Sequence, residues 1–260
     1  MVSVDGGRPT PTAHGQRATG NVAGMPHPSG RPWVVAHQGA SRVWARNTIE
    51  AFHAAAALGA DAVELDVRRT ADGALVVLHD AVLPGWNRPV IAMARAQLSS
   101  AAPHVPDLEQ ALDACAGLWI GVEVKNSPFD PDWDPEARTA GAVAELVRSA
   151  GIIDRVLAMS FDPATVARAD AAGLRSAILV DRSADPIDAL ESMPGVEMVL
   201  PESETMLGSR ARHIVRAATA HGAEVGVWTV NEPAEMVRLA EAGVGAIFTD
   251  EPDLARRALG

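Results

Sequence analysis

The alternation of short apolar runs with alanine-rich helical stretches constrains the fold of this chain more than any other feature. From Trp33 onward, β-branched runs recur and predict eight strands, at 33–37, 61–67, 118–124, 156–161, 175–180, 196–201, 223–229 and 245–249. Helical patterns lie between them, such as those at 47–58, 107–115, 136–149, 163–172, 209–221 and 232–242. Such alternation indicates a parallel sheet with helices outside. Eight units of this length favour an α/β fold of one (β/α)8 TIM barrel over an open sheet.

One segment, 68–80, departs from the alternation. Asp72-Gly73 is a strong hairpin signal between two β-like runs, and the gap is too short for a helix. We therefore predict that 74–79 forms an extra strand, antiparallel to an extension of the second barrel strand. If the turn centres near Asp72, the numbers of paired residues sum to about twice 72. That register places His79 opposite Glu64 to Asp66.

Polar residues gather at the carboxyl ends of the predicted strands, where (β/α)8 barrels carry their chemistry. The first strand ends in His37-Gln38-Gly39, the seventh runs into Trp228-Thr229-Val230-Asn231, and the eighth ends at Asp250. The second strand ends with Glu64 and Asp66, and the third with Glu123 and Lys125. A spacing of two places both members of each pair on one face of their strand. We expect these side chains to share one mouth.

Three carboxylates, Glu64, Asp66 and Glu123, would converge at that mouth. Their mutual repulsion would raise their pKa values unless a cation relieved it. Oxygen ligands without cysteine favour Mg²⁺ or Ca²⁺ over Zn²⁺, so we predict one divalent cation held by these residues. Lys125 adds a positive point charge suited to a phosphate oxygen.

Two imidazoles, His37 and His79, are predicted to reach the same mouth. Histidine is the side chain best placed to donate or accept a proton near neutral pH. A cation, a lysine and two histidines together fit phosphodiester cleavage, in which one histidine protonates the leaving oxygen and the other deprotonates the attacking group.

Composition narrows the class of partner and the compartment. The net charge of −11 argues against nucleic acid as the main partner, and no apolar stretch is long enough to span a membrane. The single cysteine, Cys115, excludes an internal disulfide; we expect a cytoplasmic location. Residues 1–31 are rich in Gly, Pro, Ser, Thr and Ala, without the apolar region of a secretory signal. We predict a flexible tail there and one barrel domain over 32–260.

At these residues the sequence resembles the glycerophosphodiester phosphodiesterases, a family of the phospholipase-C-like TIM-barrel phosphodiesterases. The resemblance runs from about Val34 to Leu254 and rests on an ordered set of segments: AHQGAS, NTIEAFHAAAALGADAVELDVRRTADGALVVLHD, VPDLEQALDAC, GVEVK, SFDP, VWTVN and GVGAIFTDEPD. It implies hydrolysis of small glycerophosphodiesters to sn-glycerol 3-phosphate and an alcohol, in several members by first attack of the substrate's own 2-hydroxyl. It also implies metal ligation by Glu64, Asp66 and Glu123, with His37 and His79 as acid and base.

Three departures from the family pattern bear on substrate binding. Gln38 stands where the family usually has Arg, Arg46 stands where it usually has Glu, and Thr249-Asp250-Glu251-Pro252 replaces the usual Thr-Asp-Arg-Pro. A guanidinium from Arg46 could hold the phosphate in place of the missing one. We take Lys125, Trp228, Gln38 and Arg46 as the candidate substrate-binding residues.

Two rival functions stay open on the sequence. A lysophospholipase D or sphingomyelinase D type enzyme would share the histidines, the acidic metal site and the tryptophan, and an exposed apolar rim beside the site would favour it. A barrel that binds phosphodiesters without turnover is kept open by Gln38. The sequence also leaves open the alcohol moiety, the choice between Mg²⁺ and Ca²⁺, and the oligomeric state.

Overall fold

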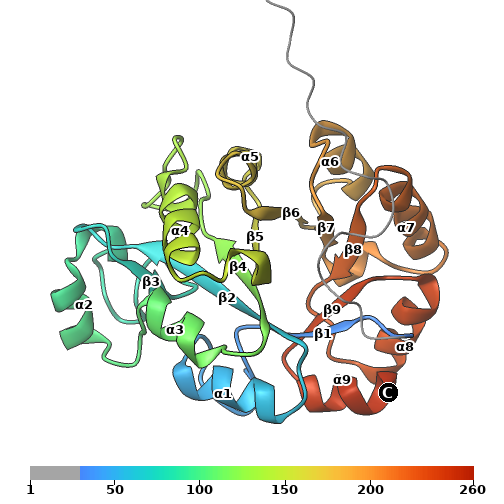
Figure 1. Cartoon of the computed structure of the whole chain (residues 1–260), viewed down its shortest axis with the longest axis horizontal. Coiled ribbons are helices and arrows are strands. Elements are labelled where there is room, and N and C mark those ends of the chain that lie inside the picture. Colours follow the sequence, from blue (N-terminus) through green and yellow to red (C-terminus); the bar gives the residue numbers. More distant parts are fainter. Residues whose placement is uncertain (1–29) are drawn as a thin grey trace, which may run out of the picture.

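The computed structural model describes residues 30–260, which form a closed barrel of parallel strands surrounded by helices (Figure 1). All but the last two residues of the predicted N-terminal tail, 1–31, lie outside the described residues. The strands are β1 (Trp33–Ala36), β2 (Ala62–Arg69), β3 (Leu75–Val77), β4 (Trp119–Val124), β5 (Val156–Ser160), β6 (Arg175–Val180), β7 (Met198–Pro201), β8 (Glu224–Val227) and β9 (Ala246–Thr249).

The helices alternate with these strands. They are α1 (Ile49–Ala57), α2 (Arg95–Ala101), α3 (Leu108–Ala114), α4 (Arg138–Ser149), α5 (Pro163–Ala171), α6 (Pro186–Ser192), α7 (Arg210–Ala220), α8 (Pro233–Ala242) and α9 (Pro252–Leu259). Short 3₁₀ turns occur at Val90–Ala92, Ile153–Arg155 and Ser203–Thr205. Proline, whose missing N–H costs nothing at the start of a helix, opens α5, α6, α8 and α9.

The ring closes through parallel pairing of β1 with both β9 and β2. The order around it is β1-β9-β8-β7-β6-β5-β4-β2, and the predicted (β/α)8 barrel is confirmed. Figure 1 shows the helices around the strands, with β3 and α2 at one edge of the molecule.

The extra strand is β3, which pairs antiparallel with the outer part of β2. Its partners are Val67 with Val77, Arg68 with Val76 and Arg69 with Leu75, so each pair sums to twice 72. The predicted register is therefore confirmed. Asp72 and Gly73 form the turn, and Gly73 has a φ of +87°, which a residue without a side chain adopts readily.

Alternation along the strands sorts side chains between two parts of the core. Trp33 and Val35 of β1 and Ala62 of β2 pack in the barrel interior with residues such as Met159 and Phe248. Residues out of phase with them pack between strands and helices. Glu64 and Asp66 are in phase with Ala62, so the same alternation that fills the interior aims both carboxylates into the barrel mouth.

Candidate active site

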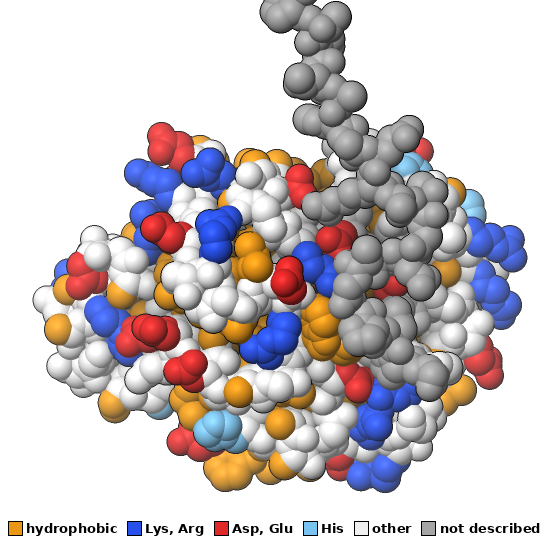
Figure 2. Space-filling model, viewed as in Figure 1, with side chains coloured by type: hydrophobic (Ala, Val, Ile, Leu, Met, Phe, Trp, Pro, Cys, Tyr) orange, Lys and Arg blue, Asp and Glu red, His pale blue; other side chains and the backbone are white. Residues whose placement is uncertain are grey.

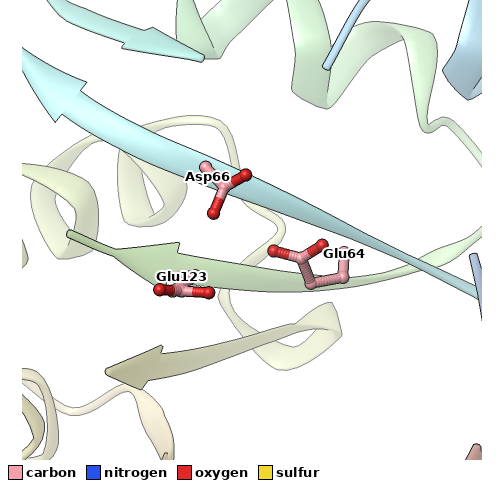
Figure 3. A group of neighbouring side chains, drawn as sticks. All are labelled: Glu64, Asp66 and Glu123. Atoms are coloured by element: carbon pink, nitrogen blue, oxygen red, sulfur yellow. The ribbon is translucent and has the colours of Figure 1, made fainter. Parts of the chain in front are cut away.

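The three predicted carboxylates meet at the mouth of the barrel (Figure 3). Asp66 on β2 lies beside Glu123 on β4 in the parallel register, and Glu64 lies beside Gly121. One oxygen from each of Glu64, Asp66 and Glu123 lies within 4.8 Å of the others, and all three side chains are buried. A Cβ at 121 would lie 2.6 Å from the Met159 Cε and 3.8 Å from the Glu64 Cβ, so the end of the Met159 side chain would have to move to admit it.

Lys125 is the positive charge of the cluster. Its Nζ lies 2.6 Å from Glu123 Oε1 and 2.9 Å from Asp66 Oδ1. Burial alone would lower the pKa of Lys125, but Glu123 and Asp66 outweigh burial and raise it. Burial likewise acts to raise the pKa of Asp66, but the charge of Lys125 brings it below its ordinary value. Asp66 and Lys125 therefore form a charged pair.

Glu64 is the destabilised member of the cluster. Burial, followed by the charges of Asp66 and Glu123, raises its pKa well above the ordinary value. Burial also raises the pKa of Glu123, although Lys125 opposes it. Glu64 Oε1 is buried without a hydrogen-bond partner among the described residues. Two carboxyl groups with raised pKa values and an unpartnered buried oxygen fit a site that a divalent cation completes.

The β1–α1 loop holds the other oxygens of the cluster. Gln38, with a φ of +56°, turns its backbone N–H toward Glu64 Oε2 at 2.9 Å, and its side-chain Nε2 donates to Asp66 Oδ2 at 2.7 Å. Asn47 Nδ2 donates to the same Asp66 oxygen at 2.7 Å, and Asn47 Oδ1 accepts from the Asp66 backbone N–H at 3.2 Å. Both side-chain donors bind Oδ2 of Asp66, so the other carboxylate oxygen, Oδ1, pairs with Lys125.

His37 is oriented by Asp250, which follows β9. The imidazole Nδ1 lies 2.9 Å from Asp250 Oδ1, which leaves Nε2 toward the cluster, 4.0 Å from Glu64 Oε2. Ser41 and Asn231 also donate to Asp250, at 2.7 Å and 2.9 Å. Burial acts to raise the pKa of Asp250, but these hydrogen bonds outweigh burial and hold it far below its ordinary value. An ionised Asp250 can accept a hydrogen bond from Nδ1–H, which leaves Nε2 without a proton and facing the cluster.

His79 lines a hollow beside the cluster. The hollow has a volume of about 320 Å³ and is also lined by Glu123, Lys125 and Ser127. The backbone N–H of Leu78 donates to the Asp66 carbonyl at 3.0 Å, which anchors the return strand against β2. The His79 imidazole is 56% exposed, with Nδ1 2.7 Å from Asp80 Oδ1.

The candidate substrate-binding residues lie in different environments. Gln38 is buried, and its amide N–H is committed to Asp66. Arg46 is exposed on the β1–α1 loop, and within residues 30–260 its side chain has no hydrogen bond or ion pair. Trp228 is half-buried; its Nε1 donates to the Leu200 carbonyl at 2.6 Å, and its ring contacts the edge of Phe161.

Sequence reasoning missed two residues that shape the site, Asn47 and Arg68. Asn47 has a φ of +58°, a conformation that asparagine tolerates better than most residues, but nothing in the sequence shows its contact with Asp66. Arg68 continues the spacing of two from Glu64 and Asp66, and this pattern could have marked it as a residue of the mouth.

Exposed apolar side chains are concentrated at the end of the barrel that carries the carboxylate cluster. Of the nine large apolar side chains that are exposed among the described residues, eight lie in segments that follow strands at the mouth. They are Val43, Trp44, Val82, Trp86, Phe129, Trp133, Phe161 and Leu207; the ninth, Val237, lies on α8. We call the eight residues the apolar rim. Elsewhere the surface is mixed, and acidic and basic side chains are interspersed on the face that Figure 2 shows.

Comparison with known proteins identifies the family. The model of the glycerophosphoryl diester phosphodiesterase family matches residues 37–254. The chain belongs to that family. Its members are phosphoric diester hydrolases. Among its relatives, an uncharacterized protein, YqiK, of Bacillus subtilis is 30% identical over 85% of this chain and 96% of its own. "Probable glycerophosphodiester phosphodiesterase 2" of Mycobacterium tuberculosis is 30% identical over 82% of this chain and 84% of its own.

A solved structure of the family has the same architecture. The crystal structure of a glycerophosphodiester phosphodiesterase from Agrobacterium tumefaciens has a TM-score of 0.70 and 25% identity, covering 87% of this chain and 99% of that one. Among the described residues of the present chain, no helix is both long and apolar enough to cross a membrane.

Proposed function

We propose that this chain hydrolyses glycerophosphodiesters to sn-glycerol 3-phosphate and an alcohol, using one divalent cation, Mg²⁺ or Ca²⁺. The observation that carries the proposal is the convergence of three buried carboxylates and Lys125 beside a hollow into which His79 opens. Membership of the glycerophosphoryl diester phosphodiesterase family supports the same reaction.

Glu64, Asp66 and Glu123 would hold the cation, which would polarise the phosphoryl group and stabilise its negative charge. Lys125 contributes separately. Two carboxylates contact its ammonium group, which carries three N–H donors. The third donor can therefore reach a phosphoryl oxygen while the contacts with Asp66 and Glu123 persist.

His37 and His79 move the protons in this proposal. As the new P–O bond forms, one imidazole takes the proton from the attacking hydroxyl group, which belongs either to water or to the substrate's own 2-hydroxyl. In the second case water then opens the cyclic phosphate to give sn-glycerol 3-phosphate. As the P–O bond to the alcohol breaks, the other imidazole gives a proton to the leaving oxygen. Asp250 supports His37 by accepting from Nδ1, so that Nε2 exchanges the proton. Asp80 stands in the same relation to His79.

The test is turnover of glycerophosphocholine, followed by direct detection of sn-glycerol 3-phosphate and choline. His37→Ala and His79→Ala should each lower turnover roughly 100-fold or more, the usual scale for general acid–base catalysis. His53→Ala is the matched control, because His53 is exposed on α1. Binding of substrate without turnover by the metal-loaded chain would instead identify a non-catalytic barrel.

A second substrate class is favoured by the apolar rim. A phosphodiester that carries an acyl chain, as in a lysophospholipase D type reaction, could bury that chain against rim residues such as Phe129, which is 95% exposed. The measurement is the ratio of turnover on lysophosphatidylcholine to turnover on glycerophosphocholine. Phe129→Ser and Trp86→Ser should lower that ratio, and Val237→Ser, outside the rim, should not. A ratio that is the same in all three variants and the native chain would contradict this second function.

A further inference from the structure

Arg68 reaches over the mouth from the outer part of β2. Strand β2 outruns its neighbour, since β4 ends at Val124, which pairs with Val67. Arg68 is in phase with Glu64 and Asp66, so its side chain leaves the strand on the face of the cluster but one step farther out. The side chain is only 4% exposed and lines the same hollow as His79 and Lys125.

The Arg68 guanidinium joins two walls of this hollow. On one side, Nε donates to the backbone carbonyl of His79 at 2.8 Å. On the other, Nη1 lies 2.7 Å from both carboxylate oxygens of Asp132, and Nη2 donates to Asp130 Oδ2 at 2.9 Å. Asp130 and Asp132 belong to the β4–α4 loop, which follows the Lys125 segment.

The contacts match what only arginine can supply. A guanidinium presents five donors in a rigid plane, so Nε can donate to the His79 carbonyl while Nη1 and Nη2 each donate to a different carboxylate at a fixed angle to it. Asp132 is 5% exposed, which makes its pair with Arg68 a buried, doubly hydrogen-bonded one. Lysine at this position would keep the charge but lose the fixed geometry.

From these contacts we infer that Arg68 is a positioning residue that sets the place of His79 relative to the β4–α4 loop and the carboxylate cluster. The His79 imidazole is half-exposed, and its side chain contacts the neighbouring Asp80. Its placement therefore depends on the backbone, which Leu78 N–H fixes on one side and Arg68 on the other. The role of Arg68 rests on the proposed function of His79.

The test is a double-mutant cycle between Arg68→Lys and His79→Ala, with turnover of glycerophosphocholine as the readout. A misplacement of about 1 Å can lower a rate roughly 100-fold, so Arg68→Lys should lower kcat about 10- to 100-fold with a smaller change in KM. In the His79→Ala background, the same substitution should have little further effect, because the group that Arg68 positions is already gone. Equal losses in both backgrounds would show a merely structural role and overturn the proposal.

A control and a second readout complete the design. Arg138→Lys alters another arginine–aspartate pair of the same loop, with Asp134, but does not touch His79; it should leave turnover near the native value. The imidazole resonances of His79, assigned with His79→Ala, should shift in Arg68→Lys and stay in place in Arg138→Lys. If Arg68→Lys does not fold, Asp132→Asn serves in the same cycle. Unchanged His79 resonances refute the positioning role, whereas absence of turnover in the native chain refutes the proposed function.

Discussion

Replacing Glu64 by Gln should stabilise the metal-free protein and remove most of its stabilisation by metal. Glutamine keeps an oxygen that can accept from the Gln38 backbone N–H, as Glu64 Oε2 does at 2.9 Å. It removes one of three buried negative charges whose oxygens lie within 4.8 Å of one another. The substitution therefore changes the charge of the cluster while keeping its shape.

The magnitude follows from Coulomb's law. At an effective dielectric constant of about 20, two unit charges 4.8 Å apart, the upper limit of the separation between these oxygens, repel by about 3.5 kcal/mol, and closer pairs repel more. Lys125 offsets part of the two repulsions that Glu64 experiences. Uptake of a proton by Glu64 limits the remainder, so we expect a gain of about 1–3 kcal/mol, or several degrees in Tm, for the chelated variant.

The pH dependence of stability independently tests whether Glu64→Gln stabilises the metal-free protein. The pKa of folded Glu64 is raised above its unfolded value, so the native cluster is most stable below the unfolded pKa and loses stability as the pH rises through the folded pKa. The advantage of Glu64→Gln in chelator should therefore grow with pH and vanish in acid.

The assay is thermal melting in chelator and in saturating Mg²⁺ or Ca²⁺. Native protein should gain from metal, and Glu64→Gln should gain little, because a ligand that binds only the folded state stabilises in proportion to its affinity. Glu50→Gln, on the exposed side of α1, controls for the change in net charge. A chelated Glu64→Gln variant that melts below native protein, or gains as much from metal, would refute this electrostatic account.

Two further substitutions and one chemical modification test the surroundings of the cluster. Asp250→Asn should lower turnover roughly 100-fold, since an amide cannot hold the His37 tautomer. The variant should also have a lower Tm than native protein at neutral pH. Because the pKa of folded Asp250 is lowered, the ionised group stabilises the native protein at higher pH, and this contribution is lost as acid protonates it. The difference in Tm should therefore shrink in acid, and a difference that is constant with pH would contradict this. Arg46→Ala should lower kcat/KM roughly 10- to 150-fold if its guanidinium holds the phosphate, and unchanged kinetics would exclude that role. Lys125, the only lysine of the sequence, should acylate more slowly than the N-terminal amine by mass spectrometry, because it is buried and charged; equal rates would contradict that.

The barrel could be predicted from the sequence because its signals are local. Each strand is a short apolar run, and the position of the Asp72-Gly73 turn was enough to predict the register of the β2–β3 hairpin. No residue ranges were predicted for the helices α2, α6 and α9. The first two have seven residues each, too few for a clear helical period.

The convergence of Glu64, Asp66 and Glu123 could also be predicted, because strand phase and strand ends determine it. The hydrogen bonds around them could not. The contact of Asn47 with Asp66 spans 19 residues and that of Arg68 with Asp132 spans 64, and both depend on loop conformations that no local pattern specifies. The register brought the backbone of Leu78, the residue before His79, to Asp66, but the exposure of the His79 ring depends on the surrounding loops.

The central claim is that this mouth is a metal-dependent phosphodiesterase site. The most direct test is to remove the metal, return it, and measure turnover of glycerophosphocholine at each stage. Exhaustively chelated native protein should release no sn-glycerol 3-phosphate, and either Mg²⁺ or Ca²⁺ should restore the activity. The variant Asp66→Asn, which keeps the shape of a residue with no exposed surface, should recover little at the same metal concentration. Full turnover after exhaustive chelation, or full recovery by Asp66→Asn, would contradict the account.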